Sequence, residues 1–146
     1  KDEPTNNFCI PSGAYREPKS FYKKANLVLK EGIDFKREVE IKKDGEKSKL
    51  PEKTILLTAI SKPKRLLEFL PKNIETIFFE DHHTFTKDEI DTILEKYREF
   101  GIVTTQKDFV KLEKFHLKNI YIMDLKIKLS EKLDFKELNT YLNINS

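Results

Sequence analysis

The chain has 146 residues, of which 38% are hydrophobic and 36% charged, and its formal net charge is +3. This length is enough for one domain with a buried core. A single cysteine, Cys9, excludes an internal disulfide. No apolar run approaches about 18 residues and no signal-peptide pattern is present, which predicts a soluble, intracellular protein. Lysines are interleaved with glutamates and arginines are few, which argues against a nucleic-acid partner.

The first 50 residues predict loops and two short strands. Residues 1–20 contain three of the six prolines and are expected to form a loop. Residues 26–30 predict a short strand, and the alternation of polar and apolar residues over 35–41 predicts a strand exposed on one side. Residues 42–49 are charged and predict a surface hairpin tip or linker, with a boundary near Pro51.

After this boundary the predicted elements become regular. Residues 54–60 form a continuous apolar run, typical of a strand covered on both faces. A helix is expected to begin at Pro63, with Ser61 as a candidate N-cap. Three leucines are expected on the inner face of this helix: Leu66, Leu67 and Leu70.

A second strand and helix follow at residues 74–79 and 86–100. Thr86 and Glu89 have the spacing of a capping box, and Gly101 is expected to stop the helix. Apolar residues at helical spacing predict its buried face. They are Ile90, Ile93, Leu94 and Tyr97.

The remaining segments predict strands at 102–105 and 119–123 and helices at 107–112 and 134–142. Strand and helix thus alternate four times with short connections. This pattern predicts the α/β class, a three-layer α/β/α lobe with a mostly parallel sheet.

Polar residues gather in the turns after the predicted strands, which share one edge of a parallel sheet. Ligands bind at this edge in open α/β sheets. One turn contains Asp81, His82 and His83, and so holds two of the three histidines. The other turns contribute Ser61-Lys62, residues 104–108 and Asp124.

Such hydroxyl, imidazole, carboxylate and lysine groups can hold a phosphorylated ligand and move a proton. A structural interpretation stays open beside this one. Ser61, Thr86 and Thr105 are also ordinary helix N-caps, and Asp81 with His82 can serve only the fold.

Two common kinds of site are missing from the sequence. The four glycines, at positions 13, 32, 45 and 101, are far apart, so no glycine-rich phosphate loop or dinucleotide fingerprint exists. Cys9 stands alone and His116 is distant from His83, so no zinc-ligand spacing occurs.

Four segments resemble the motifs of one family. Residues 11–18 (Pro-Ser-Gly-Ala-Tyr-Arg-Glu-Pro) resemble Pro-Ala-Gly-Pro-Leu-Arg-Glu-Pro, and residues 59–65 (Ala-Ile-Ser-Lys-Pro-Lys-Arg) resemble Gly-Ile-Ala-x-Pro-x-Arg-Phe. Residues 79–82 (Phe-Glu-Asp-His) resemble Phe-x-Asp-His. Residues 104–112 (Thr-Thr-Gln-Lys-Asp-Phe-Val-Lys-Leu) resemble Thr-Thr-Glu-Lys-Asp-Ala-Val-Lys-Leu. In this order and spacing, the chain resembles the tetraacyldisaccharide 4'-kinase family of lipid A biosynthesis.

The resemblance implies the C-terminal part of a P-loop kinase with two α/β/α lobes. It assigns residues 1–25 to a motif-bearing loop from the N-terminal lobe, 26–50 to inter-lobe linker strands and 51–146 to the C-terminal lobe. The P-loop and an Asp-rich magnesium motif belong to the preceding part of such an enzyme. ATP and Mg²⁺ are therefore expected to be bound mainly there.

The implied reaction transfers the γ-phosphate of ATP to the 4'-hydroxyl of a tetraacyldisaccharide 1-phosphate. The implied partners are this lipid A disaccharide precursor, the N-terminal P-loop lobe and the inner-membrane surface of a Gram-negative cell. The enzyme is expected to be cytoplasmic and peripheral on that membrane. The chain alone is expected to be inactive.

The resemblance also assigns roles to individual residues. His82 is the expected catalytic residue of this part, because it would support the catalytic Asp of the other lobe. Arg16 and Lys107 are expected to bind substrate, and no metal ligand is expected. The expected supporting residues are Glu17, Asp81, Thr105 and Asp108.

Two other functions stay open at this point. Asp81, His82 and His83 match a metal-dependent phosphoesterase of the Asp-His-His type, with Asp108 and Asp124 as further candidate ligands. The chain can also be a non-catalytic α/β binding module.

Overall fold

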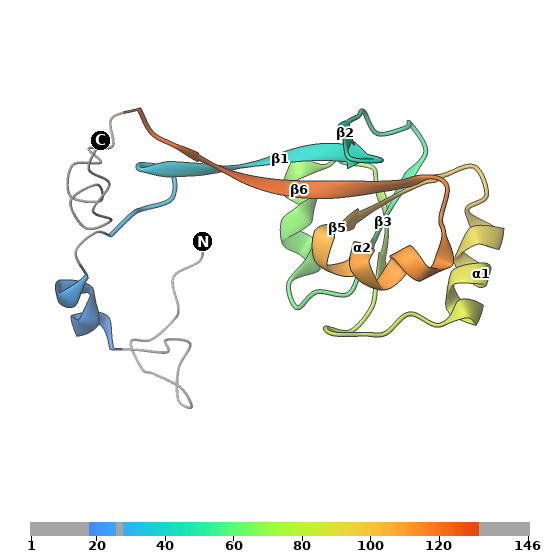
Figure 1. Cartoon of the computed structure of the whole chain (residues 1–146), viewed down its shortest axis with the longest axis horizontal. Coiled ribbons are helices and arrows are strands. Elements are labelled where there is room, and N and C mark those ends of the chain that lie inside the picture. Colours follow the sequence, from blue (N-terminus) through green and yellow to red (C-terminus); the bar gives the residue numbers. More distant parts are fainter. Residues whose placement is uncertain (1–17, 26–27, 132–146) are drawn as a thin grey trace. The chain divides into compact units, whose positions relative to one another are not determined.

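The computed structural model describes residues 18–25 and 28–131 of the chain (Figure 1). The chain divides into two compact units. One consists of Lys1–Arg37 with Ile127–Ser146, and the other is Glu38–Lys126. The candidate site described below lies wholly in the second unit. The predicted helix over 134–142 falls outside the described residues.

A six-stranded sheet has the strand order β2-β1-β6-β5-β3-β4. β3 is parallel to both β4 and β5, and β5 is parallel to β6, whereas β1 and β2 are antiparallel. The mostly parallel sheet predicted from the sequence is therefore confirmed. The strands are β1 (Phe35–Lys43), β2 (Glu46–Lys47), β3 (Thr54–Thr58), β4 (Glu75–Phe78), β5 (Gly101–Thr105) and β6 (Ile120–Leu129).

Two α-helices and three 3-10 helices are found among the described residues. The α-helices are α1 (Lys87–Lys96) and α2 (Gln106–Leu112), and the 3-10 helices are η1 (Lys19–Lys24), η2 (Pro63–Phe69) and η3 (Glu113–Phe115).

In the first unit, the strand predicted for residues 26–30 is wrong over its described part, residues 28–30. Lys30 instead begins a turn. Its N–H donates to Asp34 Oδ2 at 2.6 Å, and its carbonyl accepts from the Asp34 N–H at 2.8 Å. Gly32, with φ of +86°, supplies the left-handed conformation inside this turn. The aspartate side chain thus satisfies backbone groups locally, in competition with strand pairing.

The charged segment after β1 is a tight hairpin, as the sequence predicts. Lys42 is paired with Lys47 across the two strands. The two residues at the tip, Asp44 and Gly45, have φ of 51° and 85°. Two consecutive positive φ values are those of a type I′ turn, which matches the twist of the flanking strands.

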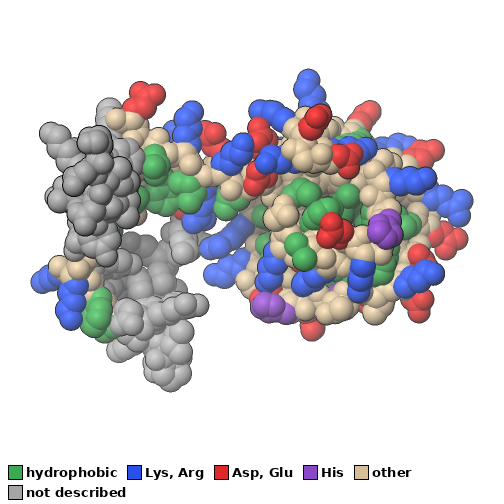
Figure 2. Space-filling view, viewed as in Figure 1, with side chains coloured by type: hydrophobic (Ala, Val, Ile, Leu, Met, Phe, Trp, Pro, Cys, Tyr) green, Lys and Arg blue, Asp and Glu red, His purple; other side chains and the backbone are tan. Residues whose placement is uncertain are grey.

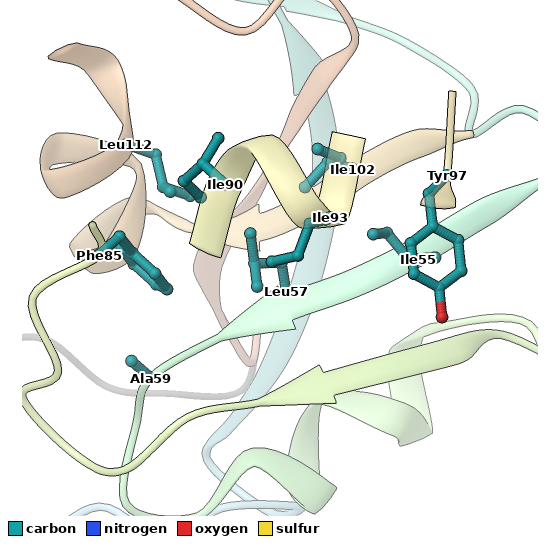
Figure 3. Packing of buried hydrophobic residues seen from close by; sticks show 9 residues of the cluster. All are labelled: Ile55, Leu57, Ala59, Phe85, Ile90, Ile93, Tyr97, Ile102 and Leu112. Atoms are coloured by element: carbon teal, nitrogen blue, oxygen red, sulfur yellow. The ribbon is translucent and has the colours of Figure 1, made fainter. Parts of the chain in front are cut away.

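One face of the sheet is covered by α1 and α2. Every residue of β3 is buried, which confirms the prediction of a strand covered on both faces. Because side chains alternate along a strand, Ile55 and Leu57 point to the same face. Figure 3 shows the cluster that they form with the helices. Its members are Ile55, Leu57, Ala59, Phe85, Ile90, Ile93, Tyr97, Ile102 and Leu112.

The opposite face is covered by η2, which is a 3-10 helix rather than a longer α-helix. A 3-10 helix repeats every three residues, so Leu66 and Phe69 both pack on the core while Leu67 stays 36% exposed. The inward orientation predicted for Leu67 is therefore wrong. Pro63 begins the helix as predicted, but the N-cap is Lys62 rather than Ser61, with no side-chain cap.

Helix α1 begins as the sequence predicts and ends earlier. Thr86 Oγ1 accepts from the Glu89 N–H, and Glu89 accepts from the Thr86 N–H, which completes the capping box. The helix ends at Lys96, four residues before the predicted end. Leu94 is 38% exposed rather than buried. Gly101 does not stop this helix but begins β5, where an added Cβ would lie 3.0 Å from the Pro51 ring.

Strand β6 is longer than predicted, and this changes the position of Asp124. The predicted strand ended at residue 123, which placed Asp124 in a turn at the candidate site. Asp124 instead lies within β6, and its Oδ2 pairs with Lys42 Nζ on β1 at 2.5 Å. It is therefore a cross-strand ion pair and not part of the site.

Charged side chains of both signs are interspersed on the face of the second unit that Figure 2 shows. Lys53 pairs with Glu99 at 3.0 Å. Glu40 accepts from Lys126 and Lys47, and the hydrogen bond from Lys126 is the main cause of its lowered pKa. Such exposed pairs contribute little to stability.

Candidate active site

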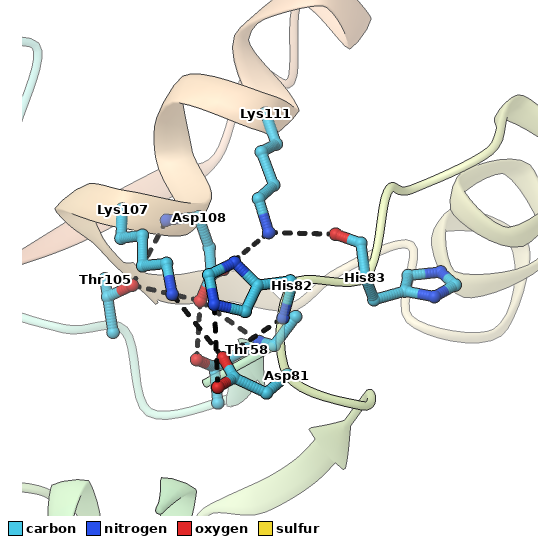
Figure 4. Close-up of polar contacts among 9 residues, drawn as sticks. Thr58, Asp81, His82, His83, Thr105, Lys107, Asp108 and Lys111 are labelled. Carbon is cyan, nitrogen blue, oxygen red and sulfur yellow. Dashed lines mark hydrogen bonds and ion pairs between the residues drawn. The ribbon is translucent and has the colours of Figure 1, made fainter. Parts of the chain in front are cut away.

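The carboxyl ends of β3, β4 and β5 meet at one edge of the sheet, because these strands are parallel neighbours. The turn after β4 and the start of α2 face each other there (Figure 4). Asp81 and His82 come from the turn, and Thr105, Lys107 and Asp108 come from the start of α2. The structure thus brings together the five described residues to which the resemblance assigned roles.

His82 occupies a strained position in this turn. Its φ of 64° lies in the left-handed region, which non-glycine residues seldom adopt. Its N–H lies 3.1 Å from Asp81 Oδ1 and 3.3 Å from the Ala59 carbonyl, and donates to both. Its side chain is 77% exposed, with Nε2 3.8 Å from Asp81 Oδ2. The imidazole is therefore accessible to a group that approaches from the solvent.

The side chains of Lys107 and His82 both lie beside the Asp81 carboxylate. Lys107 Nζ donates to Asp81 Oδ1 at 3.4 Å, across 26 residues of sequence. Asp81 thus holds an ammonium and an imidazole at one open edge. A cation and a proton-carrying ring in this arrangement can bind an anionic group and orient a carboxylate base.

Asp108 lies below this edge and is fully buried. Its Oδ2 accepts three hydrogen bonds: from Thr58 Oγ1 at 2.6 Å, the Ala59 N–H at 3.1 Å and Thr105 Oγ1 at 3.0 Å. Thr105 in turn accepts from the Asp108 N–H, so it is also the N-cap of α2. Asp108 therefore joins the start of α2 to the end of β3. Thr105 is therefore the helix N-cap that the sequence predicted, and its hydroxyl also donates to the buried Asp108.

Two residues of this cluster were missed in the sequence analysis. Thr58 lies in the buried strand β3, and nothing in its local sequence marks it as a partner of Asp108. Lys111 has its Nζ 3.8 Å from Asp108 Oδ1 and donates to the His83 carbonyl at 2.9 Å. The i, i+3 spacing of Asp108 and Lys111 on a predicted helix was the available signal for this pair.

His83 points away from His82 (Figure 4). Its Nε2 lies 3.0 Å from Glu89 Oε2. Its ring stacks on Phe79 with centroids 4.6 Å apart and meets Phe85 edge to face. His83 therefore attaches the turn to the start of α1 and does not share a site with His82.

This geometry contradicts the metal site of the phosphoesterase alternative. The rings of His82 and His83 diverge, Asp108 is buried under hydrogen bonds, and Asp124 is paired on β6. Within the described residues, no three or more His, Cys, Asp or Glu side chains are placed to hold a metal ion together.

The other predicted rim residues lie elsewhere. Thr104 is fully buried, so only one hydroxyl of the expected Thr104–Thr105 pair reaches the edge. Gln106 lines a separate pocket of about 500 Å³ beside α2. Ser61 and Lys62 are exposed in the turn after β3. Arg16 and Glu17 lie outside the described residues.

The Glu89 carboxylate predicts how the stability of the fold depends on pH. The Thr86 N–H, followed by His83, lowers the pKa of Glu89 from 4.5 to about 2. A lowered pKa stabilises the fold above the ordinary pKa, and this stabilisation is lost as the pH falls through the folded value. We expect the Tm advantage of the native chain over Glu89→Gln to shrink between pH 4.5 and about 2. A Tm difference independent of pH in thermal scans would contradict this.

Comparison with known proteins identifies the family. The sequence model of the family described as tetraacyldisaccharide-1-P 4'-kinase (LpxK) matches residues 1–143. The chain belongs to this family. The tetraacyldisaccharide 4'-kinase of Aliarcobacter butzleri (strain RM4018) is 65% identical over 143 residues, covering 98% of the chain and 46% of that protein. A Campylobacter jejuni (strain 81-176) relative of the same name is 39% identical, covering 97% and 43%.

A solved structure of an LpxK supports the fold. The structure of LpxK from Aquifex aeolicus, in complex with ATP, matches with a TM-score of 0.55 and 20% identity. The match covers 94% of the chain and 48% of that structure. The chain therefore spans about half the length of the tetraacyldisaccharide 4'-kinases that it matches, as expected for the C-terminal part. These matches confirm the resemblance drawn from the four motifs and do not support the phosphoesterase or binding-module alternatives.

Proposed function

We propose that this chain is the C-terminal part of a kinase that transfers the γ-phosphate of ATP to the 4'-hydroxyl of a tetraacyldisaccharide 1-phosphate. The observation that carries the proposal is the family match over residues 1–143. The open Asp81–His82 turn at the carboxyl edge of the sheet supplies a site that suits this chemistry. Phosphoryl transfer depends mainly on positioning and on stabilisation of charge, and little on covalent chemistry by the protein.

His82 has the central role in this proposal. Its exposed imidazole can reach a carboxylate on the N-terminal P-loop lobe, orient it and support it as it takes the proton of the attacking hydroxyl. Asp81 lies beside the ring and supports its orientation. Thr105 and Asp108 support the turn from below through the end of β3.

Lys107 and Arg16 are proposed to bind the anionic substrate. The Lys107 side chain is about half exposed at the edge, and the 3.4 Å contact of its Nζ with Asp81 is loose enough to exchange for a phosphate oxygen. The guanidinium of Arg16 matches the geometry of a phosphate, and Glu17 is proposed to support it. Arg16 and Glu17 belong to the motif at residues 11–18.

ATP is proposed to bind mainly to the N-terminal part, with Mg²⁺. The Aquifex aeolicus relative was solved in complex with ATP. This chain has no glycine-rich phosphate loop, and its described residues offer no cluster of ligands for a metal ion. In this proposal His82 acts on the carboxylate base that deprotonates the sugar hydroxyl, while Lys107 and Arg16 act on the anionic substrate.

The domain arrangement is proposed to follow the resemblance. Residues 1–25 form a loop from the N-terminal lobe, 26–50 join the lobes, and 51–146 form the C-terminal lobe. One boundary between the two compact units, at Arg37 and Glu38, falls inside the proposed linker, whereas Ile127–Ser146, which the proposal assigns to the C-terminal lobe, is grouped with Lys1–Arg37.

The lipid substrate implies a membrane location. We propose that the kinase acts from the cytoplasm, peripherally on the inner-membrane surface, where an excess of three positive charges suits an anionic surface. Among the described helices, none has the length and hydrophobicity that crossing a membrane requires.

The test compares the chain alone with a full-length kinase carrying it as the C-terminal part. We expect the full-length protein to transfer labelled phosphate from γ-labelled ATP to a tetraacyldisaccharide 1-phosphate. We expect no transfer by the 146-residue chain, because it lacks a loop that cradles the phosphates. ATP-dependent turnover by the isolated chain, or its absence in the full-length protein, would contradict the proposal.

A further inference from the structure

Lys111 connects a buried carboxylate to the turn that carries His82. Its Nζ lies 3.8 Å from Asp108 Oδ1 and donates to the His83 carbonyl at 2.9 Å. The Lys111 side chain is 25% exposed, whereas that of Asp108 is fully buried. None of the roles proposed above involves Lys111.

Asp108 needs a cation at this position. A carboxylate without access to water is costly unless it is paired and hydrogen-bonded. Oδ2 has three donors, but Oδ1 has no hydrogen-bond partner within the described part of the chain. The Lys111 ammonium is the charge next to Oδ1. Asp108 therefore attracts the Lys111 ammonium to the point from which it donates to the turn.

The His82 turn needs such a support. Its left-handed backbone at φ of 64° persists only where surrounding contacts hold it. The His82 side chain is 77% exposed, and its Nε2 lies 3.8 Å from Asp81 Oδ2, too far for a hydrogen bond. The position of the ring is therefore set by the backbone of the turn.

Two connections run from Asp108 to this backbone and close a ring of contacts. On one side, the Ala59 N–H donates to Asp108 while the Ala59 carbonyl accepts from the His82 N–H. On the other side, Lys111 joins Asp108 to the His83 carbonyl. The His82 N–H and the carbonyl of the next residue, His83, are thus both connected to one buried carboxylate.

We propose that Lys111 is a positioning residue, which holds the His82 turn in its catalytic geometry by bridging the buried Asp108 carboxylate and the His83 carbonyl. This inference rests on the proposed role of His82. It adds that the position of the His82 imidazole depends on a lysine that contacts neither the substrate nor the imidazole ring. A displacement of a catalytic group by about 1 Å can cost about 100-fold in rate.

The first test replaces Lys111 in a full-length kinase carrying this chain. We expect Lys111→Met to lower kcat by about 10- to 100-fold, with the KM for ATP nearly unchanged, because ATP binds to the other lobe. Lys111→Arg keeps the cation and its donors, and we expect it to retain most of kcat. Lys118→Met, at an exposed lysine beyond α2, is the matched control and should behave as wild type. A normal kcat in Lys111→Met, or an arginine variant as slow as the methionine variant, would overturn the inference.

The second test asks whether Lys111 acts through His82. In a double-mutant cycle with His82→Asn, Lys111→Met should cause no further loss of kcat. Losses that multiply would show that Lys111 acts elsewhere and would refute the inference alone. If His82→Asn itself keeps full activity, the proposed role of His82 fails, and this outcome is distinct from the previous one.

A double variant that removes both the Asp108 and the Lys111 charge distinguishes a folding defect from a positioning defect. If Lys111→Met leaves too little folded protein, Asp108→Asn with Lys111→Met removes both charges while it also removes the bond to His83. The same loss of kcat in the folded fraction supports the inference. Wild-type kcat in this double variant contradicts it.

Discussion

Replacement of His82 by asparagine in a full-length kinase carrying this chain is expected to lower kcat on the order of 100-fold or more, with little change in the KM for ATP. Asparagine is chosen because it tolerates the left-handed backbone, φ of 64°, better than alanine does. The variant thus removes the imidazole while it preserves the turn. The loss is expected in kcat, because the ring supports the base only during proton transfer.

His116 provides a matched control for this substitution. It is also a histidine with a left-handed backbone, at φ of 51°, but it ends η3 and lines the pocket beside α2. His116→Asn therefore repeats the chemical change and the backbone constraint away from the site, and should keep wild-type kcat. Equal effects of the two variants on kcat, measured at saturating ATP, would exclude a specific role for His82 and favour a non-catalytic part for this chain.

The parts of the fold that could be predicted are those specified by local sequence. The fully buried strand Thr54–Thr58, the Thr86–Glu89 capping box and the hairpin at Asp44–Gly45 each depend on residues within a few positions of one another. Prediction was poorer where tertiary packing chooses between local alternatives. Pro63–Phe69 is apolar enough for an α-helix, yet its packing on the sheet follows the three-residue repeat of a 3-10 helix.

The site shows the same division between local and distant information. The rule that polar residues after parallel strands share one edge correctly placed Asp81 and Lys107 together, although 26 residues separate them. The rule says nothing of side-chain direction, so it could not show that His83 turns towards Glu89. Thr58 was missed because its partner, Asp108, lies 50 residues away and only the folded sheet brings them together.

The same buried carboxylate is expected to be important for stability. Asp108→Ala should lower the free energy of unfolding of the chain by about 3–5 kcal/mol, the range for breaking a buried charged pair from one side. The variant would leave the Ala59 N–H and the hydroxyls of Thr58 and Thr105 without their acceptor. It would also leave the partly buried Lys111 ammonium without its carboxylate. A loss of this size is a large share of the total stability of a typical domain, about 5–15 kcal/mol.

Urea unfolding followed by circular dichroism measures this loss, with Asp91→Ala as the matched control. Asp91 is an exposed aspartate in the middle of α1, so its replacement should change stability by less than about 0.5 kcal/mol. Thr58→Val tests how much of the stability loss comes from the hydrogen bonds of Asp108. It removes the 2.6 Å hydrogen bond from Thr58 to Asp108 without removing the Asp108 charge. If the network is cooperative, the losses from Asp108→Ala and Thr58→Val should sum to more than the loss in the double variant. Strict additivity, or an Asp108→Ala loss no larger than that of Asp91→Ala, would show that Asp108 does not join α2 to β3, and the link from the buried carboxylate to His82 would then lose its physical basis.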